Sequence, residues 1–433
     1  LFDRARAQAA GALPDGPFRG VPIVVKDLDG SLEGAPLHMG NKLLKDIGHT
    51  GTVTSYLFQK LQDAGFVIVG KTNTPEFGLL PVAEPEAHGP TRNPWNTDHS
   101  AGGSSGGSAS AVASLMVPAA HGGDGGGSIR IPASMCGLFG LKPSRGRVSL
   151  GPDENEGWAG LVIRGSLTHT VRDSAAILDV IQGYMPGDPY TAPPPARLYR
   201  DEVGADPGRL RIALHTTTPG ELAVTDPECV AATEDAARLL ESLGHTVERA
   251  APPAFDEGEM LQSFTTILFA SVAADLALLA KIAGREITAA DVEPMTWFYN
   301  EAAEAVTAEE YVTALATAHD WSRRIVAWFF DAGYDLMLTP TLAEPPPAIG
   351  DVASRADDPL RPATRALPFA LYTGPFNMTG QPAMSVPTYW STAGLPIGVQ
   401  LVGRPNREDV LYRLAAQIEQ ARPWADRVPP LHA

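Results

Sequence analysis

The sequence is poor in cysteine and in basic residues. Its 433 residues include two cysteines, Cys136 and Cys229, which form no CxxC or Cys/His spacing. We therefore expect neither a disulfide framework nor a zinc site. The 33 lysines and arginines are outnumbered by 50 acidic residues, the net charge is −17, and no basic run occurs. This balance argues against a nucleic-acid partner, and the cysteine usage favours a reducing compartment, the cytoplasm.

Long uncharged apolar runs are also missing. The most apolar stretch, residues 266–284, contains Asp275 and Lys281. It therefore predicts a buried helix and not a membrane span. The first residues, LFDRARAQAAGALPDG, lack a basic region followed by an apolar core, so we expect no signal peptide and no membrane association. We find no linker and no internal repeat that would divide the chain.

Short apolar runs of the buried-strand type alternate with helical segments along the chain. The predicted strands are Gly20–Leu28, Phe66–Val69, Arg211–His215, Thr246–Arg249, Asp335–Leu338, Met384–Thr388 and Ile397–Val402, and the predicted helices are Thr52–Ala64, Pro227–Leu243 and Glu408–Gln420. This alternation predicts an α/β fold with helices on a parallel or mixed sheet. Residues 256–330 are mainly helical, and we assign most of their aromatic side chains to the core and some to a substrate pocket; they are Trp297, Phe298, Tyr299, Trp321 and Trp328.

Two short motifs match known patterns but lack the structural context that those patterns need. GFVIVGKT (65–72) fits the P-loop expression, yet its variable positions are Phe, Val, Ile and Val, which predict a strand and not a phosphate-binding loop. G-x-S-x-G occurs at both Ser104 and Ser105, but the preceding TRNPWNTDHSA is turn-rich and predicts no strand for a nucleophile elbow. An α/β-hydrolase would also need a catalytic histidine, for which His121 is one candidate.

A longer motif, GGSSGGSASAVASLMVPAAHGGDGGGSIRIP (102–132), resembles the signature of the amidase signature family over its whole length. Blocks at 20–27, 70–78, 89–96, 136–149, 335–341 and 394–403 extend the resemblance in family order over nearly the whole chain. The resemblance implies one large α/β domain over residues 1–433, with a mixed sheet covered by helices and a substrate-lining segment at about 256–330. EPEAHGPTRNPWN and PAAHGGD look most similar to the branch of aryl-acylamidases and nylon-oligomer (aminohexanoate cyclic-dimer) hydrolases.

The resemblance assigns Ser128 as the nucleophile, Ser104 as a bridging serine preceded by a cis peptide, and Lys26 as the base. A serine hydroxyl needs a partner that accepts its proton, and lysine can do so only when it is uncharged, which requires a buried site. Lys26 ends the apolar run VPIVV, so it lies at the end of a predicted buried strand. A structural pair with the adjacent Asp27 is the alternative.

Glycines next to Ser128 suit an oxyanion hole. The backbone N–H groups of Gly125, Gly126, Gly127 and Ser128 can point toward the oxyanion, because glycine tolerates unusual dihedral angles and close approach. Asp124 and Arg130 are expected to brace this loop. Family members often carry a β-branched residue where Gly125 stands, which predicts a looser loop here.

The expected activity is hydrolysis of a linear amide through an acyl-enzyme, without cofactor or metal, on a small-molecule substrate. The aromatic content of residues 256–330 favours hydrophobic or aryl amides, with nylon-type oligomers and carbamates or urethanes as further candidates. The alternative is the glutaminase subunit of a tRNA-dependent amidotransferase. The sequence does not determine the oligomeric state, for which a homodimer is the candidate.

Overall fold

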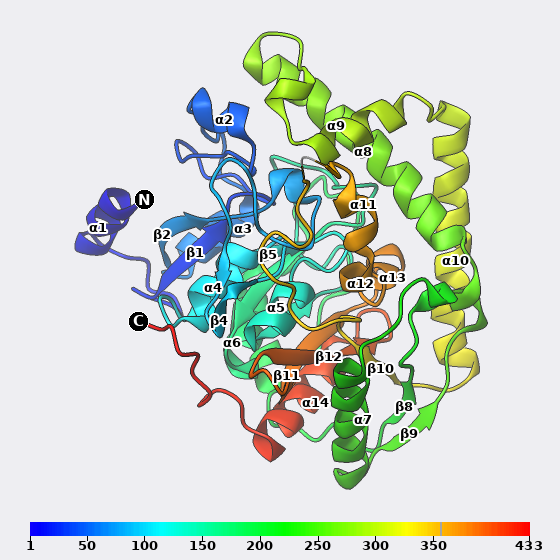
Figure 1. Ribbon diagram of the computed structural model, residues 1–433. Helices are drawn as coiled ribbons and strands as arrows, with labels where there is room; N and C mark the ends of the chain where they lie inside the picture. The colour runs from blue at the N-terminus through cyan, green and yellow to red at the C-terminus, as the bar shows by residue number, and fades with distance from the viewer. Residues whose placement is uncertain (356) are drawn as a thin grey trace.

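A ten-stranded mixed sheet runs through the molecule in the order β2-β1-β5-β7-β6-β11-β12-β10-β8-β9 (Figure 1). The computed structural model describes residues 1–355 and 357–433. β1 pairs in parallel with β2 and β5, β8 pairs in parallel with β9 and β10, and the central pairs are antiparallel. The strands are β1 Pro22–Lys26, β2 Val67–Thr72, β5 Ala119–Asp124, β6 Phe139–Lys142, β7 Ile163–Thr168, β8 Arg211–Leu214, β9 Thr246–Arg249, β10 Leu336–Pro340, β11 Ala383–Trp390 and β12 Pro396–Gly403.

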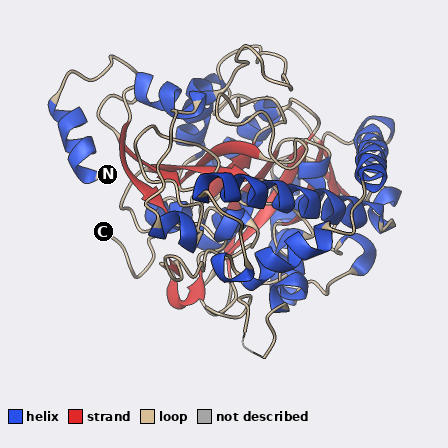
Figure 2. Ribbon diagram, turned by 90° about the horizontal axis from the view of Figure 1, so that it is seen from above, coloured by secondary structure: helices blue, strands red, loops and turns tan. Residues whose placement is uncertain are grey.

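Helices cover both faces of this sheet (Figure 2). The helices are α1 Phe2–Ala10, α2 Lys42–Asp46, α3 Tyr56–Asp63, α4 Gly106–Ala113, α5 Arg130–Cys136, α6 Val171–Ile181, α7 Pro227–Ser242, α8 Glu259–Ala283, α9 Pro294–Ala303, α10 Ala308–Asp331, α11 Arg361–Arg365, α12 Leu367–Ala370, α13 Gly374–Met378 and α14 Glu408–Ala421. Several begin at local signals: Pro227 opens α7 after the cap Asp226, and Thr307 with Glu310 forms a capping box at α10. The expected single-domain α/β class with a mixed sheet is confirmed.

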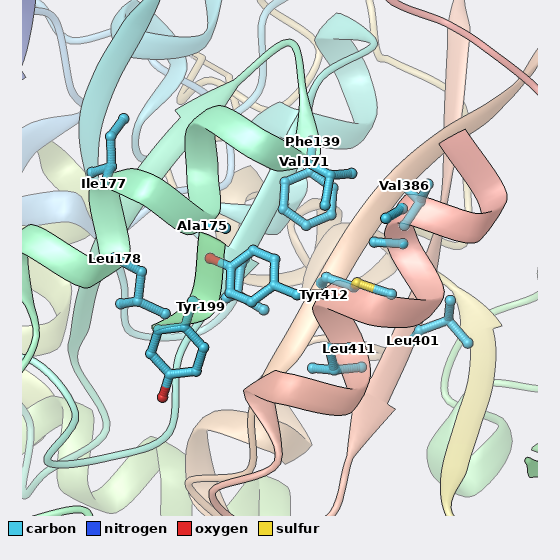
Figure 3. Close-up of a cluster of buried hydrophobic side chains, with 14 of the residues drawn as sticks. Phe139, Val171, Ala175, Ile177, Leu178, Tyr199, Val386, Leu401, Leu411 and Tyr412 are labelled. Carbon is cyan, nitrogen blue, oxygen red and sulfur yellow. The ribbon is translucent and has the colours of Figure 1, made fainter. Parts of the chain in front are cut away.

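The strands alternate their side chains between two cores because successive strand residues point to opposite faces. Ile23 and Val25 of β1 belong to the large cluster under α3, α6 and α14, whereas Val24 belongs to a second cluster with α4 and α5. Figure 3 shows part of the large cluster, where Tyr412 of α14 lies near Phe139 of β6. Burial on both faces explains why the strands appear in the sequence as continuous apolar runs.

Most predicted elements are present within a few residues of their predicted ends, and β9 has its predicted bounds. The P-loop-like stretch contains β2, as its apolar residues predict. The segment before GGSSGG is different from the prediction, because Arg92–Asn93 (β3) and Asn96–Ser100 (β4) form a two-stranded hairpin. This hairpin stands apart from the main sheet and is held by local pairing, with Trp95 Nε1 donating to the carbonyl of Cys136 at 2.8 Å.

Helix α8 also differs from its prediction as a buried helix. Only 28% of its most apolar window is buried, and Leu278 is exposed. Length and composition alone would allow α8 to cross a membrane, which is weak evidence because core helices share these properties. The helix packs against α9 and α10, and its buried apolar residues belong to two core clusters, whereas other apolar residues such as Leu261 and Phe269 line the cavities described below.

Candidate active site

Lys26 is the last residue of β1 and has a side chain that is 1% exposed. Its Nζ donates a hydrogen bond of 2.7 Å to Ser104 Oγ and forms an ion pair of 2.5 Å with Asp29 Oδ2. Asp27, the partner considered from the sequence, instead pairs with Lys71 at 3.4 Å and accepts a hydrogen bond from the His38 N–H. The buried amine therefore contacts one hydroxyl and one carboxylate.

Asp29 is a site residue that the sequence did not reveal. Its backbone has φ +60°, so the chain turns sharply after β1 and brings its carboxylate back to the strand end. Asp29 is three residues from Lys26, and strand periodicity alone would place the two side chains on opposite faces. The left-handed residue breaks this alternation, and asparagine and aspartate are the non-glycine residues that adopt it most readily. An aspartate directly before a glycine was the only available signal.

Ser104 lies in the loop between β4 and α4, and the Gly103–Ser104 peptide is cis. Ser128 lies in the turn between β5 and α5 and is 9% exposed. The backbone joins the two loops, because the N–H of Ser105 donates to the carbonyl of Ser128 at 3.2 Å. Within the described residues no hydrogen bond links Ser104 Oγ to Ser128 Oγ, but both serines and Lys26 line the same cavity.

The glycine turn before Ser128 leaves its backbone donors unused. Among the described residues, no protein acceptor takes a hydrogen bond from the N–H groups of Gly125, Gly126, Gly127 or Ser128. Gly127 has φ +136°, and a Cβ at this position would meet Ile131 Cδ1 at 2.7 Å and Thr373 Cβ at 2.8 Å. Only glycine fits there without a shift of the backbone.

A buried network holds this turn from behind. Arg130 and Asp124 form an ion pair of 2.8 Å, and Asn377 Nδ2 donates to Asp124 Oδ1 at 2.8 Å. Thr373 Oγ1 donates to the carbonyl of Gly126 at 2.6 Å. Burial by itself would raise the pKa of Asp124, but the Arg130 guanidinium overcomes this effect and lowers the pKa to about 2. Asp124 is thus an anion at neutral pH, and this charge makes its contacts with Arg130 strong.

Gly125 does not leave an open gap. A Cβ at this position would meet Trp158 Cζ3 at 2.9 Å and Val162 Cγ2 at 3.2 Å. The indole of Trp158 therefore occupies the space that a larger residue would need. The looser loop expected from Gly125 is not what the packing indicates, since a bulky aromatic side chain covers it.

Two cavities meet at Ser128, Gly78 and Trp158. The first, which we call the apolar cavity, has a volume of about 240 Å³ and is lined mainly by α8, α9 and the segment 362–374. The second, the acidic cavity, has a volume of about 380 Å³ and contains Lys26 and Ser104 together with four carboxylates. Residues lining the apolar cavity include Met260, Phe264, Leu268, Phe298, Tyr299 and Leu367.

The aromatic residues of 256–330 therefore divide between core and cavity. Trp321 is fully buried in the core, whereas Phe298 and Tyr299 of α9 line the apolar cavity. Phe376 lies in the core, and Asn377 lies in the network behind the glycine turn. Gly374, directly before them, does line the apolar cavity.

His121 is poorly suited to act as a general base. It is a buried residue of β5 whose ring packs edge-on against Phe58, with centroids 5.0 Å apart, and it lines neither cavity. Burial lowers the pKa of His121 well below its ordinary value, and the nearby Arg164 lowers it further. Neither cavity wall contains a histidine among the described residues, so the α/β-hydrolase alternative has no histidine base at this serine.

One group among the described residues has the spacing of metal ligands. The ligand atoms of Asp27, His38 and His88 lie within 4.8 Å of one another, and the two imidazole rings are stacked. None of the three lines the apolar or the acidic cavity. Among the described residues, the cavity walls around Ser128 contain no comparable group of metal ligands. Lys26 is the single cationic side chain on the described part of these walls.

The mixed sheet and the cavity that opens on Ser128 are those of an amide-cleaving hydrolase. The chain belongs to the Amidase family, whose model matches residues 2–412. It is 41% identical over 439 residues to 6-aminohexanoate-cyclic-dimer hydrolase from Paenarthrobacter ureafaciens. This match covers 100% of this chain and 88% of the relative.

Solved structures agree with this assignment. The structure of 6-aminohexanoate cyclic dimer hydrolase complexed with substrate is similar with a TM-score of 0.95 and 40% identity, covering 100% of this chain and 91% of that chain. A bacterial aryl acylamidase of the amidase signature enzymes is similar with a TM-score of 0.87 and 28% identity, covering 98% of this chain and 88% of that chain. The resemblance to the amidase signature family and to this branch is confirmed.

Proposed function

We propose that this protein hydrolyses carboxylic amides through an acyl-enzyme on Ser128, with Ser104 as proton relay and Lys26 as base. The observation that carries the proposal is the buried hydrogen bond from Lys26 Nζ to Ser104 Oγ, which lies in the cavity that Ser128 also lines. A serine becomes a competent nucleophile when a neighbouring base accepts its proton.

Acylation begins with attack of Ser128 Oγ on the amide carbonyl carbon. The Ser128 proton passes to Ser104, which gives its own proton to uncharged Lys26. Asp29 then faces the ammonium that forms, and a carboxylate at this distance stabilises that charge. The tetrahedral oxyanion accepts hydrogen bonds from the unused N–H groups of the glycine turn, each worth roughly 2.7–4 kcal/mol of barrier.

The C–N bond breaks when the relay returns the proton from Lys26 through Ser104 to the leaving nitrogen. The product is a free amine and an ester on Ser128. Water then attacks this ester, and the same relay accepts the water proton and returns a proton to Ser128. In this scheme Asp124 and Arg130 position the turn and take no part in proton transfer.

The apolar cavity and the similarity to a known hydrolase each suggest candidate substrates. The apolar cavity supports hydrophobic or aryl acyl groups, in linear amides or in carbamates and urethanes. The similarity to 6-aminohexanoate-cyclic-dimer hydrolase makes a cyclic amide of aminohexanoate the first substrate to test. Glutamine tests the amidotransferase alternative. A homodimer and a cytoplasmic location stay predictions.

The deciding experiment measures amine release from nitroanilides, aliphatic amides, cyclic diamides, carbamates and glutamine. We expect turnover of at least one apolar amide, no turnover by Ser128→Ala, and a nearly complete loss in Lys26→Ala. Lys42→Ala, at an exposed lysine of α2, is the matched control and should behave like the wild type.

The pH optimum should be neutral to alkaline because the base acts uncharged. Full activity of Ser128→Ala, or a maximum near pH 5, would contradict the mechanism, and turnover of glutamine alone would favour the alternative.

A further inference from the structure

The acidic cavity carries more negative charge than its own cations balance. Four carboxylates line it, from Asp29, Glu154, Glu156 and Asp275, and Lys26 is the single cationic residue on its wall within the described chain. Lys26 is already paired with Asp29. Glu154 pairs at 3.1 Å with Arg164, which lies behind the wall, and Glu156 accepts a hydrogen bond from the Tyr190 hydroxyl.

Asp275 is the carboxylate left over. It stands in the middle of α8, and among the described residues it has neither a hydrogen bond nor an ion pair. Burial, and to a smaller extent the charge of the neighbouring Glu154, raises the pKa of Asp275 to about 7. A half-buried carboxylate without a partner is unfavourable by itself and gains most from a cation that enters the cavity.

The proposed chemistry tells which half of the substrate enters this cavity. Ser104 and Lys26 line the acidic cavity but not the apolar one. The leaving nitrogen must receive its proton from Ser104, so it lies on the side of the acidic cavity. The apolar cavity contains neither relay residue and has a mainly apolar wall, so it is the side left for the acyl chain.

We propose that the acidic cavity selects amides whose amine part carries a second, protonated amino group, while the acyl part is apolar. The substrate class is that of N-acyl diamines and related ω-amino amides, and the inference rests on the proposed function. Asp275 binds the ammonium group, and the rings of Trp158 and Tyr311 on the same wall add cation–π attraction.

The carboxylates of the acidic cavity also attract the amine product once it is protonated. When the C–N bond breaks, the nitrogen leaves with one proton from the relay as a neutral amine. At neutral pH it takes a second proton from water and becomes an ammonium ion. The carboxylates of the acidic cavity attract this cation and oppose its attack on the ester of Ser128, since an ammonium has no free electron pair.

The test compares two amides of equal length, the hexanoyl monoamide of 1,4-diaminobutane and N-pentylhexanamide. We expect the wild type to prefer the cationic amide by at least about fivefold in kcat/KM, the value of one modest ion pair. In Asp275→Asn this ratio should fall toward one. Glu259→Gln, which changes an Arg324-paired carboxylate of the same helix outside the cavity, should keep the wild-type ratio. A wild-type ratio of one or less, or an unchanged ratio in Asp275→Asn, would overturn the proposal.

Protection of Ser128 separates this inference from a failure of the proposed function. A fluorophosphonate labels the serine without any amide turnover, and 1-pentanamine at neutral pH should slow labelling more than 1-pentanol does. Glu156→Gln, a change at an exposed position, should reduce this difference even if Asp275→Asn fails to fold. Equal protection by amine and alcohol would overturn the cation site, whereas labelling without cleavage of any amide would count against the proposed function instead.

Discussion

Replacement of Gly127 by alanine should disable the site without unfolding the protein. Gly127 has φ +136°, and an added Cβ would lie 2.7 Å from Ile131 Cδ1, 2.8 Å from Thr373 Cβ and in contact with Thr373 Oγ1. The turn must therefore shift, and its N–H groups move away from the oxyanion. Loss of one such donor raises the barrier by about 2.7–4 kcal/mol, so kcat should fall by about 10²–10³. Overpacking should lower the free energy of unfolding by only about 1–3 kcal/mol.

The neighbouring glycine provides the matched control. A Cβ on Gly126 would meet only the Phe264 ring, with Cζ at 3.5 Å, which is an ordinary contact, and the φ of Gly126 is not positive. Gly126→Ala should keep kcat within about tenfold of the wild type. The assay is kcat for one apolar amide with chemical denaturation of each variant in parallel. A fully active Gly127→Ala, or equal losses in both variants, would refute the placement of the oxyanion hole in this turn.

Three further predictions concern charge and packing around the turn. Asp29→Asn removes the carboxylate that faces the ammonium formed on the proposed base, so kcat should fall by about tenfold or more, the value of one charge-assisted hydrogen bond, and an unchanged kcat would contradict this role. Asp124 has a pKa of about 2 against an ordinary value of 3.8, so its ionised form stabilises the fold by about 2 kcal/mol above pH 4, and this stability is lost as the pH falls through 2. Chemical denaturation at pH 4 and at pH 2 should show that the free energy of unfolding falls by about 2 kcal/mol more in the wild type than in Asp124→Asn, because Arg130 has already lost its charged partner in this variant. Equal decreases in the two proteins would refute the ionised state of Asp124. Gly125→Val should push Trp158 into the cavities and lower kcat/KM for a bulky anilide more than for a short aliphatic amide, and an unchanged ratio between the two would contradict this packing.

Much of the fold follows from local sequence pattern. Runs such as Pro22–Lys26 and Thr246–Arg249 are apolar or β-branched enough to specify strands by themselves. Ala119–Asp124 has the sequence AAHGGD and forms strand β5 in the interior of the sheet, between β1 and β7. Small residues at this position have little intrinsic preference for a strand, so the pairing partners, distant in sequence, decide its conformation.

The candidate site also has one part that the sequence predicts and another part that depends on tertiary packing. The glycine turn and its serine lie in one contiguous motif, which the sequence displays directly. Asp29 reaches Lys26 only through a left-handed backbone residue, and Thr373 contacts the turn from more than two hundred residues away. Such contacts depend on tertiary packing, for which a single sequence contains no periodic signal. The exposure of α8 likewise depends on the cavity beneath it, which hydropathy does not report.

The proposed mechanism requires a covalent intermediate on Ser128, which can be trapped with an activated ester. The protein is mixed with p-nitrophenyl hexanoate, quenched in acid before the first turnover is complete, and digested for mass spectrometry. We expect a hexanoyl group on the peptide that contains Ser128, formed together with a burst of p-nitrophenol, and no such group in Ser128→Ala. A burst with the hexanoyl group on another residue, or steady turnover by Ser128→Ala, would contradict the account.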